Sequence, residues 1–196
     1  MTTNEPSDHL DPKLINDGDP RNVIDDYKTW TVEAIKADLA KQAFPFHIAI
    51  ENYQHDYNIG SIVRNANAFN VACVHIIGKK HWNRRGAMAT EKYLSLQHHR
   101  SVDSFIAAVR QLQIPIIGID NITGSAPLHQ AKLPQRAVYV FGQEGPGLSD
   151  QMQSHCESII AIEQFGSTRS VNVGVAAGIV MYEYVRRHQL TDKNSK

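Results

Sequence analysis

The stretch AVYVFGQEGPGLSD, residues 137–150, decides the expected fold. Its first five residues are apolar, which predicts a short buried strand. The next six include three glycines and a proline, which predict a tight turn whose bare backbone can approach a ligand closely. Ser149 and Asp150 then form a typical helix N-cap. A strand, a tight turn and a helix in this order are typical of open α/β sheets, which bind ligands at such junctions.

A second strand-to-helix junction lies at residues 158–188. Residues 158–162 predict a strand, residues 163–169 are polar, and residues 171–188 predict a helix. Ser170 or Asn172 is expected to cap this helix. Small residues at 174, 176, 177 and 178 give the helix a face that permits close packing against a strand, a loop or another subunit. The alternative is an ordinary terminal helix.

A third junction precedes these two in the chain. Residues 47–52 predict a strand, and a polar loop leads from it to Asn58. A helix is expected next, because apolar residues recur at helical spacing at 59, 62, 63, 66 and 69. Asn58 stands at the N-cap position, so capping is its simplest role. Arg64 lies off the apolar face and could reach a phosphate, although a lone arginine is also typical of a solvated surface.

Together, the three junctions resemble the three motifs of the SpoU/TrmH family of RNA ribose methyltransferases, within the SPOUT superfamily. The resemblance spans roughly residues 45 to 188. It is carried by Asn58-x5-Arg64, by Phe141-Gly142-x-Glu144-x-x-Gly147-Leu148-Ser149, and by Ser170-Val171-Asn172-Val173. The family implies an α/β fold, a mostly parallel sheet with helices on both faces and a C-terminal trefoil knot. Knots are rare exceptions among folds, so the knot is expected from the resemblance alone.

The resemblance also implies a cofactor, S-adenosylmethionine, held by the loops of the knot. The matching positions in this chain are Phe141, Gly142, Gln143, Glu144, Gly145, Gly147, Ile162, Ser170, Val171 and Asn172. One departure falls in the third motif, where the family's Ile-Pro strand end is replaced by Ile162-Glu163 and its leucine by Val171. We expect this departure to alter the cofactor loop rather than the class of enzyme.

The reaction implied is methyl transfer to a ribose 2′-hydroxyl, with five residues in catalytic roles. Arg64 is expected to accept the hydroxyl proton or to stabilise the developing charge, although a guanidinium has a pKa above about 12. Asn58 is expected to orient Arg64 or the ribose. Glu144, Ser170 and Asn172 are expected to organise the pocket. Without the family, their simplest roles are a solvated carboxylate and two helix caps.

The net charge of the chain is zero, yet the charges are distributed unevenly. Residues 1–26 carry seven acidic and two basic side chains, whereas residues 78–100 carry six basic side chains against Glu91 alone. The basic segment is expected to hold an RNA backbone, with Trp82 and Tyr93 available for stacking on bases. The alternative is a solvated surface loop. The residues expected to bind RNA are Arg64, Lys79, Lys80, Trp82, Arg84, Arg85 and Arg100, with His81, His98 and His99 on the same surface.

The length and composition predict one α/β domain, because 196 residues with 42% hydrophobic content suffice for a single core. This domain is expected at residues 45–190, between an N-terminal extension at 1–44 and a tail at 191–196. Within the extension, residues 1–20 are expected to be disordered and residues 23–40 to be helical. Inside the domain, a helix is expected at 101–113 and a strand at 115–120.

A cytoplasmic protein with free thiols is expected, because the chain has no signal peptide, no membrane-spanning segment and only two cysteines. Cys73 lies in an apolar run and is expected in the core. No cysteine or histidine spacing suggests zinc, and the adjacent His98 and His99 would point to opposite faces of a strand. We therefore expect no metal site.

These expectations combine into an S-adenosylmethionine-dependent RNA 2′-O-ribose methyltransferase that acts on tRNA or rRNA. Transfer RNA is placed slightly ahead, because the chain shows no large separate RNA-recognition domain. The resemblance also implies a homodimer, which fits a small-residue face of helix 171–188 that packs against its twin. Two alternatives remain: a SPOUT enzyme that methylates a base nitrogen, and a noncatalytic RNA-binding protein of the same fold. The motif setting of Arg64 argues against the first, and the retention of all five catalytic positions argues against the second.

Overall fold

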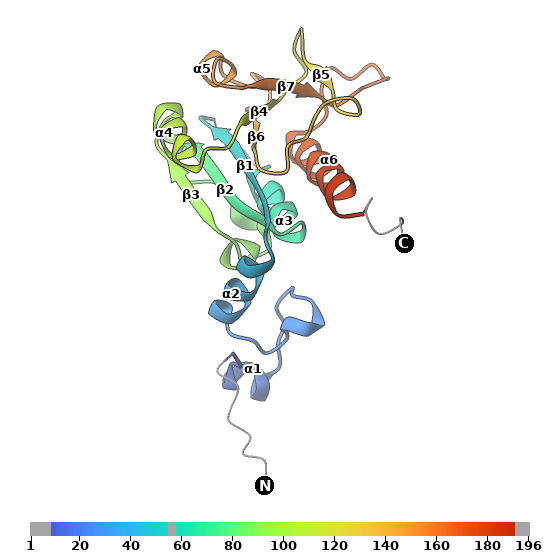
Figure 1. Cartoon of the computed structure of the whole chain (residues 1–196). Coiled ribbons are helices and arrows are strands. Elements are labelled where there is room, and N and C mark those ends of the chain that lie inside the picture. The colour runs from blue at the N-terminus through green and yellow to red at the C-terminus, as the bar shows by residue number, and fades with distance from the viewer. Residues whose placement is uncertain (1–8, 55–57, 191–196) are drawn as a thin grey trace.

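The computed structural model describes residues 9–54 and 58–190, which form one seven-stranded sheet with helices around it (Figure 1). The strand order is β3-β2-β1-β6-β4-β7-β5, and neighbouring strands pair in parallel throughout. The expected parallel α/β sheet is therefore confirmed. The strands are β1 Phe44–Asn52, β2 Val71–Gly78, β3 Leu96–His99, β4 Ile116–Ile119, β5 Ala126–Pro127, β6 Val138–Phe141 and β7 Ser158–Ala161.

The helices begin where the sequence places capping residues. Ser101 caps α4, Ser149 caps α5, and Asn172 caps α6 by accepting the N–H groups of Gly174 and Val175. Of the two caps considered for the last helix, Asn172 is the one used. The helices are α1 Pro12–Asp17, α2 Val32–Gln42, α3 Ile59–Ala68, α4 Val102–Leu112, α5 Asp150–Gln153 and α6 Val173–Val185, which a π-helical turn extends over Arg186–Leu190.

Helices cover both faces of the sheet, as expected. One face packs against α3 and α6 through buried side chains such as Ile62, Val180 and Tyr184. The other face packs against α4 and α5, with Phe105 and Met152 in the second core. Figure 1 shows α3 and α4 on opposite sides of strands β1 to β3. The sheet is therefore buried on both faces, as its continuous apolar strands require.

The small-residue face of α6 packs against α3, which was not among the partners considered from sequence. A Cβ atom on Gly174 would lie 3.3 Å from the Ser61 Cβ, and one on Gly178 would lie 3.1 Å from the Asn65 Nδ2. Glycine therefore lets the two helices approach closely. A different side of α6, formed by Val175, Ile179 and Tyr182, is exposed. Because α3 covers the small-residue face within the chain, its expected place in a dimer interface is wrong. The homodimer itself and the trefoil knot stay predictions.

The N-terminal extension differs from its expected form. Residues 1–8 lie outside the described residues, but disorder is wrong for residues 9–20, because Asp11 caps α1 and Pro12 occupies its first turn. Asp19 accepts hydrogen bonds from Arg21 and from the Thr29 N–H, which folds the segment back on itself. The helix expected at 23–40 starts later, since Thr31 caps α2. The expected tail at 191–196 also lies outside the described residues.

The other expectations for the domain are confirmed at α4 and β4, and both cysteines are free, with Cys73 buried. None of the helices in the described ranges is long and apolar enough to span a bilayer.

Candidate active site

A cavity of about 210 Å³ opens at the carboxyl edge of the sheet, where the loops after β4, β6 and β7 meet the start of α6. Parallel strands bring their carboxyl ends to one edge, so residues far apart in the chain converge there. The lining residues are Ile119, Asp120, Asn121, Phe141, Gly142, Gln143, Glu144, Gly145, Gly147, Ile162, Gln164, Ser170, Val171, Asn172, Val173 and Ala176. All ten positions expected to bind the cofactor are among them.

The glycine turn after β6 shapes one wall of this cavity. Gln143 and Gly147 exchange both backbone hydrogen bonds at 3.0 Å, which closes the turn. A Cβ atom on Gly142 would lie 2.0 Å from the carbonyl carbon of Gly147, and Gly147 itself has a φ of 76°. Only glycine fits these two positions, and the backbone is thereby left bare toward the cavity.

Three of the residues with expected catalytic roles form one hydrogen-bonded group beside the cavity. The Asn58 Nδ2 donates to Glu144 Oε2 at 2.5 Å, and the Asn172 Nδ2 donates to Asn58 Oδ1 at 2.9 Å. The Asn172 Nδ2 also lies 3.4 Å from Glu144 Oε1. Asn58 occupies the N-cap position of α3, yet its side chain makes no capping hydrogen bond to that helix. Its side chain instead joins all three motifs.

Two further catalytic candidates are placed differently. Ser170 lines the cavity. Arg64 is exposed on α3 and does not belong to the cavity lining. Its neighbour Asn65 faces α6 and donates to the Gly174 carbonyl at 3.3 Å, so Arg64 points to another side of the helix. Within one chain, Arg64 is therefore not brought together with the other four residues.

Sequence reasoning missed three polar residues of the cavity. Asp120 accepts the Leu148 N–H at 2.8 Å, which holds the glycine turn against the end of β4. Asn121 lines the cavity next to it. The Gln164 Oε1 is buried and has no hydrogen-bond partner among the described residues. Asp120 could have been found by its place at the end of a predicted strand, whereas Gln164 lies in a loop that carries no such signal.

A buried carboxylate on β1 also holds the C-terminal end of the glycine turn. Glu51, near the end of β1, is fully buried and accepts hydrogen bonds from the Ser149 N–H at 2.8 Å and from the Ser149 hydroxyl at 2.6 Å. Negative charge at the start of α5 is favourable. This contact fixes the end of the glycine turn relative to β1.

The basic segment lies beyond the carboxyl ends of β2 and β3. The cationic residues expected to bind RNA are exposed there, namely Lys79, Lys80, Arg84, Arg85 and Arg100. The Arg84 guanidinium lies 5.7 Å from the Trp82 ring centre. Stacking by Tyr93 is a wrong expectation, because packing beside Arg21 leaves it only 6% exposed.

His99 is likewise buried rather than part of the basic surface, with 8% exposure, while His98 is exposed as expected for adjacent strand residues. His99 lies in a row with His75 and His47 on the α4 face of the sheet. Burial lowers the pKa of all three imidazoles, to about 3 for His75, where His47 and His99 add to the effect. The row is therefore neutral near pH 7.

Three comparisons place the chain among known proteins. The SpoU rRNA Methylase family model matches residues 45–182. The 23S rRNA (guanosine-2'-O-)-methyltransferase RlmB of Salmonella typhi is 33% identical over 151 residues, which cover 73% of this chain and 60% of that protein. The chain thus spans about three fifths of the curated relatives that it matches.

Solved structures show the same fold. The A. aeolicus TrmH/SpoU tRNA modifying enzyme superposes with a TM-score of 0.72 at 21% identity, over 84% of this chain and 86% of that one. The SpoU methyltransferase AviRb from Streptomyces viridochromogenes, solved in complex with AdoMet, superposes with a TM-score of 0.66 at 23% identity, over 72% and 57% of the two chains.

Proposed function

Because this chain belongs to the SpoU rRNA methylase family, we propose that it is an enzyme that transfers a methyl group from S-adenosylmethionine to a ribose 2′-hydroxyl of RNA. One observation carries the proposal. Residues from the second and third motifs line a single cavity, and Asn58 of the first motif joins them beside it through its contacts to Glu144 and Asn172.

The cavity suits this cofactor in its hydrogen-bonding groups and its charge. The bare backbone of the glycine turn can exchange hydrogen bonds with a flat base, and the buried Gln164 Oε1 offers one unused acceptor. Asp120 and Glu144 place two carboxylates on the lining. When bound, S-adenosylmethionine supplies an electrophilic methyl group on a positively charged sulfur. The two carboxylates favour that charge, because opposite charges attract.

The roles of this chain's own residues follow from their places. Asn172 and Asn58 hold the Glu144 carboxylate in position through their amides. Arg64 is to accept the hydroxyl proton or to stabilise the oxygen as it becomes negative. Since Arg64 lies outside the cavity of its own chain, we infer that it serves the cavity of a second copy. The exposed apolar side of α6, with Val175, Ile179 and Tyr182, supports such a homodimer.

We propose ribosomal RNA ahead of transfer RNA as the substrate. The curated relatives at about 30% identity are named 23S rRNA enzymes, whereas two solved neighbours whose names refer to tRNA are 24% and 21% identical. This order reverses the slight preference for tRNA drawn from the sequence. The exposed cations after β2 and β3 support binding to the phosphates of either RNA. The cytoplasmic location also stays a prediction.

The test is a methyl-transfer assay on both RNA pools. The purified chain is incubated with bulk rRNA or bulk tRNA and a labelled methyl donor, and digested nucleosides are identified by mass spectrometry. We expect 2′-O-methylated nucleosides from rRNA. Base-methylated nucleosides would support the base-nitrogen enzyme instead. Failure to bind S-adenosylmethionine in calorimetry would support the noncatalytic RNA-binding protein.

A further inference from the structure

A second cluster of reactive side chains lies on the α4 face of the sheet, away from the cavity. Cys73 and His75 are two residues apart in β2, so their side chains point to the same face of the sheet. His47 is the direct partner of Cys73 on the neighbouring β1. One potential ligand atom from each of His47, Cys73 and His75 lies within 4.8 Å of the other two. Two rigid, paired strands therefore hold two nitrogens and one sulfur together.

The hydrogen bonds of the cluster orient these atoms. The His47 Nδ1 lies 2.8 Å from the His75 Nε2, so the two nitrogens face each other. The second nitrogen of His75, Nδ1, lies 2.9 Å from the His99 Nε2. His75 and His99 also pack edge-on against Phe105 of α4. His75 is fully buried, so its ring has little room to turn.

We propose that His47, Cys73 and His75 bind a zinc ion through His47 Nδ1, Cys73 Sγ and His75 Nε2. Neutral imidazoles and a thiolate are the ligands that zinc prefers, at about 2.0–2.1 Å to nitrogen and about 2.3 Å to sulfur. The fourth position is open to water on the side of His47, which is only half-buried.

The protons balance in this step. Cys73 releases its thiol proton to solvent as its sulfur bonds to the metal. The two histidines bind as neutral rings, with the remaining proton of His47 on Nε2 and that of His75 on Nδ1. The latter proton is donated to His99, which thereby orients the ligand, as partners of metal-bound histidines commonly do. The zinc replaces the direct hydrogen bond between His47 and His75.

A metal accounts for more of the cluster than hydrogen bonding does. A row of neutral histidines explains the contacts of His47, His75 and His99 but does not include the Cys73 sulfur beside them, which donates to the Val74 carbonyl at 3.8 Å. Zinc uses all four residues. Its binding energy would add to the folding energy and would tie β1 to β2 on the α4 face.

The test uses the untagged full chain and the metals alone. We expect the wild type, after incubation with Zn²⁺ and gel filtration, to hold one equivalent of zinc by mass spectrometry of the metal. We expect Co²⁺ in its place to give the near-ultraviolet band of a cobalt–thiolate bond. Cys73→Ser should lose that band. His99→Gln should keep it and weaken metal affinity about 10- to 100-fold.

Two matched controls separate the site from adventitious binding. Cys156→Ser removes the other, partly exposed thiol, and His98→Gln removes the exposed histidine next to His99. Both should bind metal as the wild type does. The proposal is overturned if the wild type gives no cobalt–thiolate band, or if the band survives in Cys73→Ser and disappears in Cys156→Ser. The wild-type spectrum decides the matter even if Cys73→Ser does not fold.

Discussion

At the scale of single residues, the two asparagines at the starts of α3 and α6 have roles beyond helix capping. Asn58 occupies a capping position, but its side-chain amide donates to Glu144 and accepts from Asn172 instead. Asn172 does both, since its Oδ1 caps α6 and its Nδ2 donates to Asn58. A short polar side chain at a helix start can thus serve the helix and the cavity at once.

Arg64→Ala should lower the rate of methyl transfer by about 100-fold or more, as the loss of an acid–base group commonly does. Affinity for S-adenosylmethionine should stay the same, because Arg64 does not line the cavity. The two effects are measured by single-turnover assay and by calorimetry. Arg110→Ala, an exposed arginine on α4, is the matched control.

A wild-type rate in Arg64→Ala would refute the catalytic role. The inference that Arg64 acts on a second copy has its own test. Mixed dimers of Arg64→Ala with Gly142→Ala should regain part of the activity, because one of their two cavities has both a working turn and an arginine. No recovery on mixing would mean that Arg64 acts within its own chain.

Gln164→Leu should weaken S-adenosylmethionine binding by roughly 3- to 10-fold, the effect of one hydrogen bond. The buried Gln164 Oε1 has no partner among the residues that the structure describes, so a ligand donor is its natural partner. The dissociation constant is measured by calorimetry. Gln97→Leu, an exposed glutamine on β3, is the control. An unchanged dissociation constant in Gln164→Leu would show that this acceptor faces no part of the cofactor.

At the scale of elements, the glycine turn between β6 and α5 is held by hydrogen bonds within it and to the ends of two strands. Its backbone bonds between Gln143 and Gly147, the Asp120 contact to Leu148, and the Glu51 contacts to Ser149 hold it from three sides. Such a turn is set before any ligand arrives, which lowers the entropy that binding has to overcome.

Gly142→Ala should destabilise the fold by about 1–3 kcal/mol and abolish cofactor binding, because overpacking forces the backbone apart. Its Cβ would lie 2.0 Å from the Gly147 carbonyl carbon. Gly166→Ala is the matched control, since a Cβ there meets nothing within 4 Å. Stability is measured by urea denaturation. Equal midpoints for the two variants would contradict the geometry of the turn.

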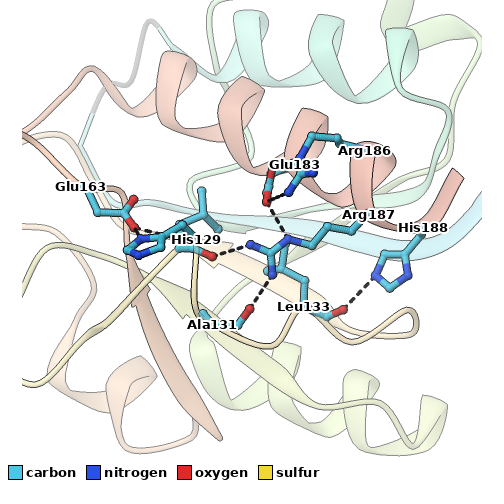
Figure 2. A network of polar contacts seen from close by, with 9 residues as sticks. His129, Ala131, Leu133, Glu163, Glu183, Arg186, Arg187 and His188 are labelled. Atoms are coloured by element: carbon cyan, nitrogen blue, oxygen red, sulfur yellow. Dashed lines mark hydrogen bonds and ion pairs between the residues drawn. The ribbon is translucent and has the colours of Figure 1, made fainter. Parts of the chain in front are cut away.

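At the scale of the whole molecule, hydrogen bonds join the C-terminal end of α6 to residues 128–133, which precede β6. Figure 2 shows Arg187 donating to the Ala131 carbonyl while its Nε contacts Glu183. The Arg187 guanidinium also donates to the Leu128 carbonyl. The His188 ring contacts the Leu133 carbonyl in the same view, and His129 pairs with Glu163. The contacts of Arg187 and His188 join the end of α6 to a loop more than fifty residues earlier, so they couple α6 to the sheet.

The ion pairs of Glu183 with Arg186 and Arg187 should make the stability of the fold depend on pH in the acid range. Hydrogen bonds from Arg186, then from Arg187, lower the pKa of the Glu183 carboxyl from 4.5 to about 2. A depressed folded-state pKa means that the contribution is fully present above the unfolded value of about 4.5 and is lost as the pH falls toward 2. The melting temperature of the wild type should therefore fall over this range.

Glu183→Gln isolates this contribution. The variant should be less stable than the wild type at pH 7, on the order of 1–2 kcal/mol, the value of a hydrogen bond to a charged group. The difference between the two should shrink toward pH 2, as measured by thermal melts followed by circular dichroism. A difference that stays constant with pH would exclude the carboxylate as its source.

The sequence alone determined the element order and the chemistry-bearing loops of this protein. Apolar runs such as residues 137–141, the glycines at 142, 145 and 147, and the caps Ser101, Ser149 and Asn172 act through local physics. Strand burial, turn geometry and helix capping depend on near neighbours in the chain. The family motifs then predict which residues bind the cofactor, and all ten of them line one cavity.

Only the tertiary structure decided which distant side chains meet. Strand order and register bring Asn58 to Glu144 and His47 to Cys73. They also decide that Tyr93 and His99 are buried. Arg64 was placed by the direction in which α3 faces α6. Local patterns carry no record of lateral pairing between strands or of close approach between helices, because those contacts join residues tens of positions apart.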